Sequence, residues 1–131
     1  MPTDNVQEFM SLKAAAAYTT YQYYMVQYAG TSGEGRVINN TGTVPVGVLY
    51  NEPDDGEAMQ IAYKHGDTML VIAGSTAITI GAKVGPNASG KAIPVTSDGE
   101  VMAGVAVQAS GTANNIIAMH FEPRVLGTGG L

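Results

Sequence analysis

Four acidic side chains that lie close together are the first feature of this chain that could do chemistry. They belong to the segment Glu52-Pro53-Asp54-Asp55-Gly56-Glu57. Clustered carboxylates bind hard cations such as Ca²⁺, so the segment is a candidate cation site. Its spacing is not that of an EF-hand loop, however, and Asp-Asp-Gly is an ordinary turn sequence. We therefore expect a solvated turn without a metal.

The two histidines are the next candidates, either as metal ligands or as general bases. His65 and His120 lie far apart in the sequence, and neither has a second ligand-type residue at a metal-binding spacing. His65 falls in a predicted turn, whereas His120 alternates with Ile116 and Ala118 on one face of a predicted strand. Structural or surface roles are expected for both histidines.

Nucleophilic catalysis and phosphate binding have no matching motif. The chain has no Gly-x-Ser-x-Gly elbow, and Ser89-Gly90-Lys91 lacks the spacing of a Ser-x-x-Lys pair. The glycine-rich residues 30–36 do not end in the Lys-Ser/Thr pair of a phosphate-binding loop. Because the chain also has no cysteine, thiolate metal sites and disulfides are excluded. The sequence predicts a protein that is not an enzyme and that needs no cofactor.

The charge of the chain narrows the classes of partner. Six basic and eleven acidic residues give a formal net charge of −5, and the basic residues are scattered. Nucleic-acid binding generally needs a basic stripe, and anionic lipid headgroups repel such a chain, so neither nucleic acid nor membrane is an expected partner. No apolar run approaches membrane-spanning length. The N-terminal residues do not resemble a secretion signal, so we expect synthesis in a cytoplasm.

The elements that would position candidate functional side chains include a strand-turn-strand unit that occurs twice. Its copies span residues 44–63 and 101–121, and each copy contains one glycine inside its first strand, Gly47 and Gly104. Alternate residues of the strands are apolar, as in a half-buried strand. A glycine inside a strand marks a bulge, a bend or the close approach of another backbone. The matching apolar positions are Val44, Val46, Val48 and Tyr50 with Val101, Ala103, Val105 and Val107, followed by Met59, Ile61 and Tyr63 with Ile117, Met119 and Phe121.

The short, closely spaced strands predict an all-β fold, either a small β-barrel or a β-sandwich. With 131 residues the chain fits one β domain, which we place at residues 18–123. Residues 1–17 are expected to form an N-terminal arm, either mobile or a short helix, because Val6, Phe9 and Met10 roughly follow a helical period. Residues 124–131 are expected to be a loose tail.

Aromatic side chains are concentrated in residues 18–28, which contain five of the seven tyrosines. Their composition favours a strand, although a helical stripe is also compatible with the spacing. A strand would place tyrosines on both faces. Such a strand either lies between two layers of the domain or forms an interface, since tyrosine is enriched at protein interfaces.

Several segments, taken in order, resemble the small head decoration, or capsid cement, proteins of bacteriophages. They begin with Ala17-Tyr18-Thr19-Thr20-Tyr21-Gln22-Tyr23-Tyr24-Met25-Val26 and Thr43-Val44-Pro45-Val46-Gly47-Val48-Leu49-Tyr50-Asn51-Glu52-Pro53. Residues 56–58, 80–84 and 104–106 continue the similarity, which covers most of residues 17–122. Each motif is short, so the resemblance rests on their order along the chain.

This resemblance implies a β-rich domain that binds the outer face of an assembled icosahedral shell, often as a trimer, without a cofactor or an active site. The partner would be the major capsid protein, and the location would be the capsid exterior of the virion. From the resemblance and the aromatic density, the predicted contact residues are Phe9, Met10, Tyr18, Tyr21 and Tyr23. The alternative is an exposed recognition module that binds a host-surface glycan or another ligand. A third hypothesis, a small hydrolase, would need carboxylates or a histidine to meet in one pocket.

Overall fold

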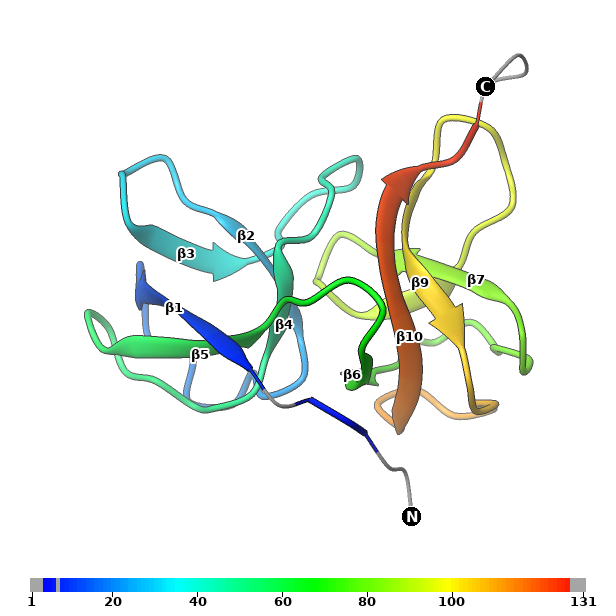
Figure 1. Cartoon of the computed structure of the whole chain (residues 1–131), viewed down its shortest axis with the longest axis horizontal. Helices are drawn as coiled ribbons and strands as arrows, with labels where there is room; N and C mark the ends of the chain where they lie inside the picture. Colours follow the sequence, from blue (N-terminus) through cyan, green and yellow to red (C-terminus); the bar gives the residue numbers. More distant parts are fainter. Residues whose placement is uncertain (1–3, 7, 128–131) are drawn as a thin grey trace.

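The computed structural model describes residues 4–6 and 8–127, and within them the chain forms ten strands and no helix. The strands divide into two lobes that pack side by side (Figure 1). This arrangement confirms the predicted all-β fold.

The first lobe is a closed five-stranded barrel in the order β1-β3-β2-β4-β5. β1 and β3 pair in parallel, and all other neighbours are antiparallel. Closure leaves no strand of this lobe with a free edge. The strands are β1 (Phe9–Ala14), β2 (Met25–Tyr28), β3 (Glu34–Val37), β4 (Gly47–Leu49) and β5 (Ala58–Ala62).

The second lobe is a five-stranded sheet in the order β6-β10-β9-β7-β8, with antiparallel neighbours. An isolated parallel bridge between Ala73 and Ala92 joins the two ends of this sheet. The strands are β6 (Thr68–Ile72), β7 (Lys83–Pro86), β8 (Ala92–Pro94), β9 (Val101–Ala106) and β10 (Ile116–Val125).

The two lobes share a hydrophobic core because one wall of the barrel is buried on both faces. Val26, Leu49 and Ile61 belong to the cluster inside the barrel. Their sequence neighbours Met25, Val48 and Ala62 belong to the cluster that contains the core of the second lobe, including Phe121. Successive side chains of a strand point to opposite faces, so β2, β4 and β5 serve both cores. The lobes are therefore expected to fold as one unit.

The repeated unit forms the hairpins β4–β5 and β9–β10, one in each lobe. A Cβ atom on Gly47 would overlap the carbonyl oxygen of Ala62, and one on Gly104 would overlap the carbonyl oxygen of His120. Of the roles predicted for these glycines, the structure shows close backbone approach in both copies.

The helix expected near the N-terminus is wrong for residues 9–14, which form β1. This strand pairs with β5 from Phe9 opposite Ala62 to Lys13 opposite Ala58. Leu12 and Ala14 are buried while their neighbours are exposed, so the segment has the period of two that a barrel strand needs. Residues 1–3 and 7 of the expected arm lie outside the described residues.

The tail also differs from expectation, because β10 continues to Val125 and Leu126 is buried. β9 pairs with this end of β10, placing Arg124 opposite Met102 and Val125 opposite Val101. These contacts hold Arg124 and Val125 in the sheet, whereas the sequence predicts a loose tail from residue 124. Residues 128–131 lie outside the described part of the chain.

The tyrosine-rich segment is not one continuous strand, since only Met25–Tyr28 forms β2. Residues 18–24 instead make two successive turns, in which the N–H of Tyr21 donates to the carbonyl of Tyr18 and the N–H of Tyr24 to that of Tyr21. Tyr23 has a φ of 73°, a left-handed conformation that interrupts any strand. The predicted distribution of tyrosines over two strand faces is therefore wrong.

Candidate functional site

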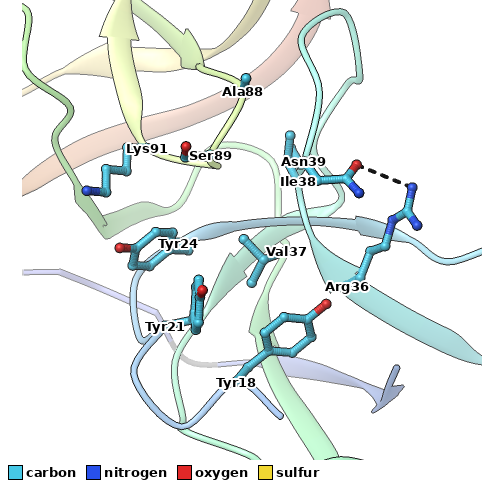
Figure 2. A pocket seen from close by; sticks show the side chains of 10 residues that line it. All are labelled: Tyr18, Tyr21, Tyr24, Arg36, Val37, Ile38, Asn39, Ala88, Ser89 and Lys91. Carbon is cyan, nitrogen blue, oxygen red and sulfur yellow. Dashed lines mark hydrogen bonds between the residues drawn. The ribbon is translucent and has the colours of Figure 1, made fainter. Parts of the chain in front are cut away.

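The turns before β2 shape a hollow of about 420 Å³, which we call the tyrosine pocket (Figure 2). Figure 2 shows the tyrosine rings on one side, Ala88 and Ser89 on the opposite side, and Val37 between them. The pocket is lined by Tyr18, Tyr21, Tyr24, Arg36, Val37, Ile38, Asn39, Ala88, Ser89 and Lys91.

Three rings of the tyrosine pocket brace one another. Tyr18 and Tyr21 meet edge to face with their centroids 5.5 Å apart, and Tyr21 and Tyr24 are tilted with centroids 4.8 Å apart. The two turns place a tyrosine at every third residue, which brings these rings together. Such aromatic pairs contribute about 0.5–1.5 kcal/mol beyond area burial. The pocket wall is thus held in place by its own rings.

The opposite side of the tyrosine pocket comes from the loop between β7 and β8. The side-chain oxygen of Asn87 accepts hydrogen bonds from the N–H groups of Ser89 (2.8 Å) and Lys91 (3.0 Å). The carbonyl of Gly90 accepts the N–H of Met25 at 2.8 Å, which docks this loop on β2. The pocket therefore lies where the second lobe meets the first.

Among the described residues, two cationic side chains and no acidic side chain line the tyrosine pocket. Lys91 Nζ donates to Asn114 Oδ1 at 2.6 Å and lies 5.7 Å from the centroid of the Tyr24 ring. Arg36 Nη2 donates to Asn39 Oδ1 at 3.3 Å. Arg36 Nε is buried and makes no hydrogen bond within residues 4–6 and 8–127. The pocket thus offers unused donors to an anion.

Burial is the largest cause that raises the pKa of the Tyr18 phenol; Tyr21 and Asp55 also raise it, whereas the Val37 backbone and Arg36 oppose the shift. Like an ordinary tyrosine, Tyr18 is protonated at neutral pH and can donate a hydrogen bond.

A second hollow, of about 530 Å³, is lined mainly by the first lobe together with Pro123 of β10, and it shares no residue with the tyrosine pocket. We call it the apolar groove. Tyr28 is 61% exposed and Val44 is 41% exposed, so the groove presents large apolar surfaces to solvent. The groove is lined by Met10, Gln27, Tyr28, Thr43, Val44, Pro45, Val46, Tyr63, His65 and Pro123.

The five predicted contact residues fall into separate places. Tyr18 and Tyr21 line the tyrosine pocket, whereas Met10 lines the apolar groove. Phe9 is partly exposed on the outer face of β1, where its ring contacts that of Tyr50 at 5.4 Å. Tyr23 packs against the shared core.

Tyr23 and Tyr50 join the lobes. The Tyr23 N–H donates to the Leu49 carbonyl at 2.6 Å, and its carbonyl accepts the N–H of Ile72, a residue of β6, at 2.9 Å. The Tyr50 hydroxyl accepts the N–H of Leu70 at 2.6 Å and donates to Asp4 at 2.7 Å. Burial is the largest cause that raises the pKa of Tyr50. These two tyrosines are therefore structural.

Sequence reasoning missed Tyr24, Arg36 and Lys91 in the tyrosine pocket and Tyr28 and Val44 in the groove. The spacing of three residues among the pocket tyrosines was present in the sequence. The composition of this segment nevertheless predicts a strand, because the left-handed turn at a tyrosine has no sequence signal. The contribution of Lys91 depends on contact between the lobes, which local patterns do not encode.

The acidic segment forms a turn that is held by its own carboxylates. Glu57 accepts the N–H of Asp54 at 2.7 Å, and the side chain of Asp54 accepts the N–H of Asp55 at 2.8 Å. No group of three metal-ligating side chains capable of holding an ion occurs in the described part of the chain.

The histidines have separate structural environments. His65 packs edge to face on Phe121, with ring centroids 5.7 Å apart, and His120 Nε2 lies 3.2 Å from a carboxylate oxygen of Glu122.

Across residues 4–6 and 8–127 there is no helix that could cross a bilayer.

No protein-family model matches this sequence, and no curated protein sequence matches it significantly. Among solved structures, the chain is similar to the N base of head fiber gp8.5 from bacteriophage phi29. The TM-score is 0.69 at 18% sequence identity, and the similarity covers 92% of this chain and 98% of the phage chain. The chain thus has the fold of a phage head protein, and the resemblance seen in the sequence is confirmed at the level of the fold.

Proposed function

We propose that this protein is a non-enzymatic structural component of a bacteriophage head, which binds the outer surface of the assembled capsid and stabilises it. The partner is the major capsid protein, and the protein resides on the exterior of the virion. The observation that carries this proposal is the fold shared with the phi29 head fiber base over nearly the whole length of both chains.

The apolar groove is the surface best suited to the shell. Methionine and aromatic side chains are enriched at the centres of protein interfaces, and the groove presents Met10 and Tyr28 together with the exposed Val44. Phe9 is next to Met10 on β1, so its side chain points to the opposite face of the strand and lies outside the groove. We therefore assign the shell contact to Met10, Tyr28 and Val44. Tyr23, whose backbone and ring connect the lobes, is assigned a structural role.

Stabilisation follows from binding to the assembled state alone. A protein that binds the shell but not its dissociated subunits stabilises each site by about 2.7 kcal/mol when its free concentration is a hundred times Kd. Repetition of the site over a symmetric shell multiplies this effect. Modest contacts are sufficient for such a role.

Assembly as a trimer would strengthen the attachment further, because the first docked subunit raises the effective concentration of the others. Sedimentation equilibrium measures this state directly. We expect a species of three times the 13.5 kDa chain mass. A strictly monomeric protein, free and on heads, would refute the trimer.

The direct test mixes the purified protein with heads that lack it, then measures co-sedimentation and the temperature at which the heads rupture. We expect saturable binding and a higher rupture temperature. Absence of both would overturn the proposal.

A pair of matched variants identifies the surface. The double variant Tyr28→Ala with Val44→Ala is expected to bind heads at least tenfold more weakly, since removing each exposed apolar side chain costs about 1 kcal/mol or more at an interface. The control is Ile80→Ala with Val125→Ala, which removes side chains that are 72% and 51% exposed on the second lobe. Equal losses in the two double variants would contradict the assignment of the groove.

A further inference from the structure

We propose that the tyrosine pocket binds an anionic saccharide, with the acid group of the sugar held by Arg36 and its ring packed on the tyrosines. This inference is independent of capsid binding, because the pocket and the apolar groove have no residue in common.

Charge is the first reason. The chain has eleven acidic and only six basic residues, yet two of those basic residues and no acid in the described part of the chain line the tyrosine pocket. Figure 2 shows Arg36 and Lys91 on opposite sides of the view, with the tyrosines between them. An anion that approaches this otherwise acidic protein is attracted to a local site of opposite sign.

The hydrogen-bonding state of Arg36 is the second reason. A guanidinium has five N–H donors, and a planar fork of them matches a carboxylate. In the structure Nη2 bonds Asn39, while Nε is buried and has no partner among the described residues. An unsatisfied buried donor is unfavourable, so the guanidinium gains a charge-assisted bond when it turns toward an acid group in the pocket.

The walls of the pocket indicate a sugar. Tyrosine rings supply rigid apolar faces for the C–H face of a pyranose, and their hydroxyls, with Ser89 and the Asn39 amide, supply partners for sugar hydroxyls. A volume of about 420 Å³ lies within the range of roughly 300–1,000 Å³ that is usual for small-ligand sites.

An acidic peptide is the competing ligand, and the fold disfavours it. Extended peptides commonly bind by adding a strand to a free sheet edge. Beside the tyrosine pocket, β2 pairs with both β3 and β4, and β3 pairs with both β1 and β2. No edge is free for a peptide to extend this barrel sheet.

The test measures binding of the full chain to an array of glycans that end in sialic or uronic acids. The same array carries each glycan as its neutral methyl ester and also carries acidic peptides. We expect binding to at least one acidic glycan, at least tenfold weaker binding to its ester, and weaker binding to the peptides. No binding to any acidic glycan, equal binding to the ester, or preference for the peptides would overturn the proposal.

Variants then locate the site by calorimetry with the best glycan of the array. Arg36→Gln and Tyr21→Ala are each expected to weaken binding at least tenfold. Arg124→Gln is the matched control, because it makes the same change at an exposed arginine on β10. Unchanged thermal unfolding of Arg36→Gln would show that its loss of binding is local. Equal affinity of Arg36→Gln and Arg124→Gln for the glycan would refute the assigned site.

Capsid binding provides an independent readout. Arg36→Gln is expected to co-sediment with heads as the unmodified protein does. If Arg36→Gln no longer bound heads but still bound the glycan, the two surfaces would not be independent. If the unmodified protein bound glycan but not heads, only the proposed capsid function would fail.

Discussion

The two lobes contain the same hairpin but differ in what they place on their surfaces. Both use a glycine where two strands approach closely, Gly47 in one lobe and Gly104 in the other. All seven tyrosines, however, lie between Tyr18 and Tyr63, in the first lobe or its connections. The second lobe exposes scattered aliphatic side chains instead, namely Ile80, Val107 and Val125. The comparison shows that the two lobes share a hairpin, whereas the tyrosine-rich surfaces belong to the first lobe and its connections.

The largest expected effect tests whether the two hairpins are equivalent. Gly47→Ala and Gly104→Ala each place a Cβ against a backbone carbonyl oxygen, so each should lower the free energy of unfolding by about 3 kcal/mol or more. Urea denaturation measures the loss.

Gly111→Ala is the control for these substitutions, since a Cβ at this position meets nothing within 4 Å. It should change stability by about 0.5 kcal/mol or less. If Gly47→Ala were disruptive and Gly104→Ala harmless, the equivalence of the hairpins would be refuted.

The sequence predicted the repeat and its glycines because strand alternation is a local pattern with a period of two. The prediction from sequence was wrong where tertiary contacts determine the local structure. Leu12 and Ala14 join the barrel interior, so residues 9–14 form a strand despite a thin helical pattern. In the same way, Tyr23 adopts its left-handed turn where its backbone bonds Leu49 and Ile72.

The candidate site was only partly predictable for a related reason. Aromatic density identified Tyr18 and Tyr21, but the cationic side of the pocket joins Arg36 with Lys91 from the other lobe. The sequence shows the residue types, whereas contact between the lobes determines which of them meet.

The next effect concerns the connection between the lobes. Tyr50→Phe removes the hydroxyl that accepts the N–H of Leu70 on β6 and donates to Asp4. We expect a loss of about 1–3 kcal/mol, because the Leu70 N–H loses its partner. Tyr28→Phe, at a 61% exposed ring, is the matched control and should stay within about 0.5 kcal/mol. Equal effects would show that the hydroxyl does not join the lobes.

The same residue predicts a dependence on alkaline pH. Because burial raises the pKa of Tyr50 in the folded state, its phenol keeps its proton where the unfolded chain would lose it. Its contribution is complete below pH of about 10, the ordinary pKa of tyrosine, and declines as the pH rises further. Tyr50→Phe should therefore lose stability less steeply above that pH in urea titrations. An unchanged slope would contradict this account.

A smaller effect is expected at the loop that brings the second lobe to the tyrosine pocket. Asn87→Ala removes the acceptor of two backbone N–H groups, those of Ser89 and Lys91, and should destabilise the chain by about 1 kcal/mol. Asn40→Ala, which loses one exposed bond to Thr43, is the control and should cost less. Thermal unfolding measures both variants, and a larger loss at Asn40 would contradict the role of the loop.

The smallest expected effect lies in an exposed turn of the second lobe. Glu100 accepts the N–H groups of Ser97 and Thr96, and these bonds lower the pKa of its carboxyl. A lowered pKa favours folding above the ordinary pKa of glutamate, and the benefit disappears as the pH falls through the folded-state value. Glu100→Gln should therefore be slightly less stable near neutral pH and converge with the unmodified protein in acid. A difference that grows in acid would reverse this assignment.

Amide hydrogen exchange on the intact chain, free and bound to heads, tests most directly whether the first lobe carries the capsid-binding surface. The amides of residues 27, 28, 43, 44 and 46, which line the apolar groove, should exchange at least tenfold more slowly on heads. Residues 79–81 and 107–109 of the second lobe should exchange at the same rate in both states. Protection confined to the second lobe, or none in the groove, would contradict the account.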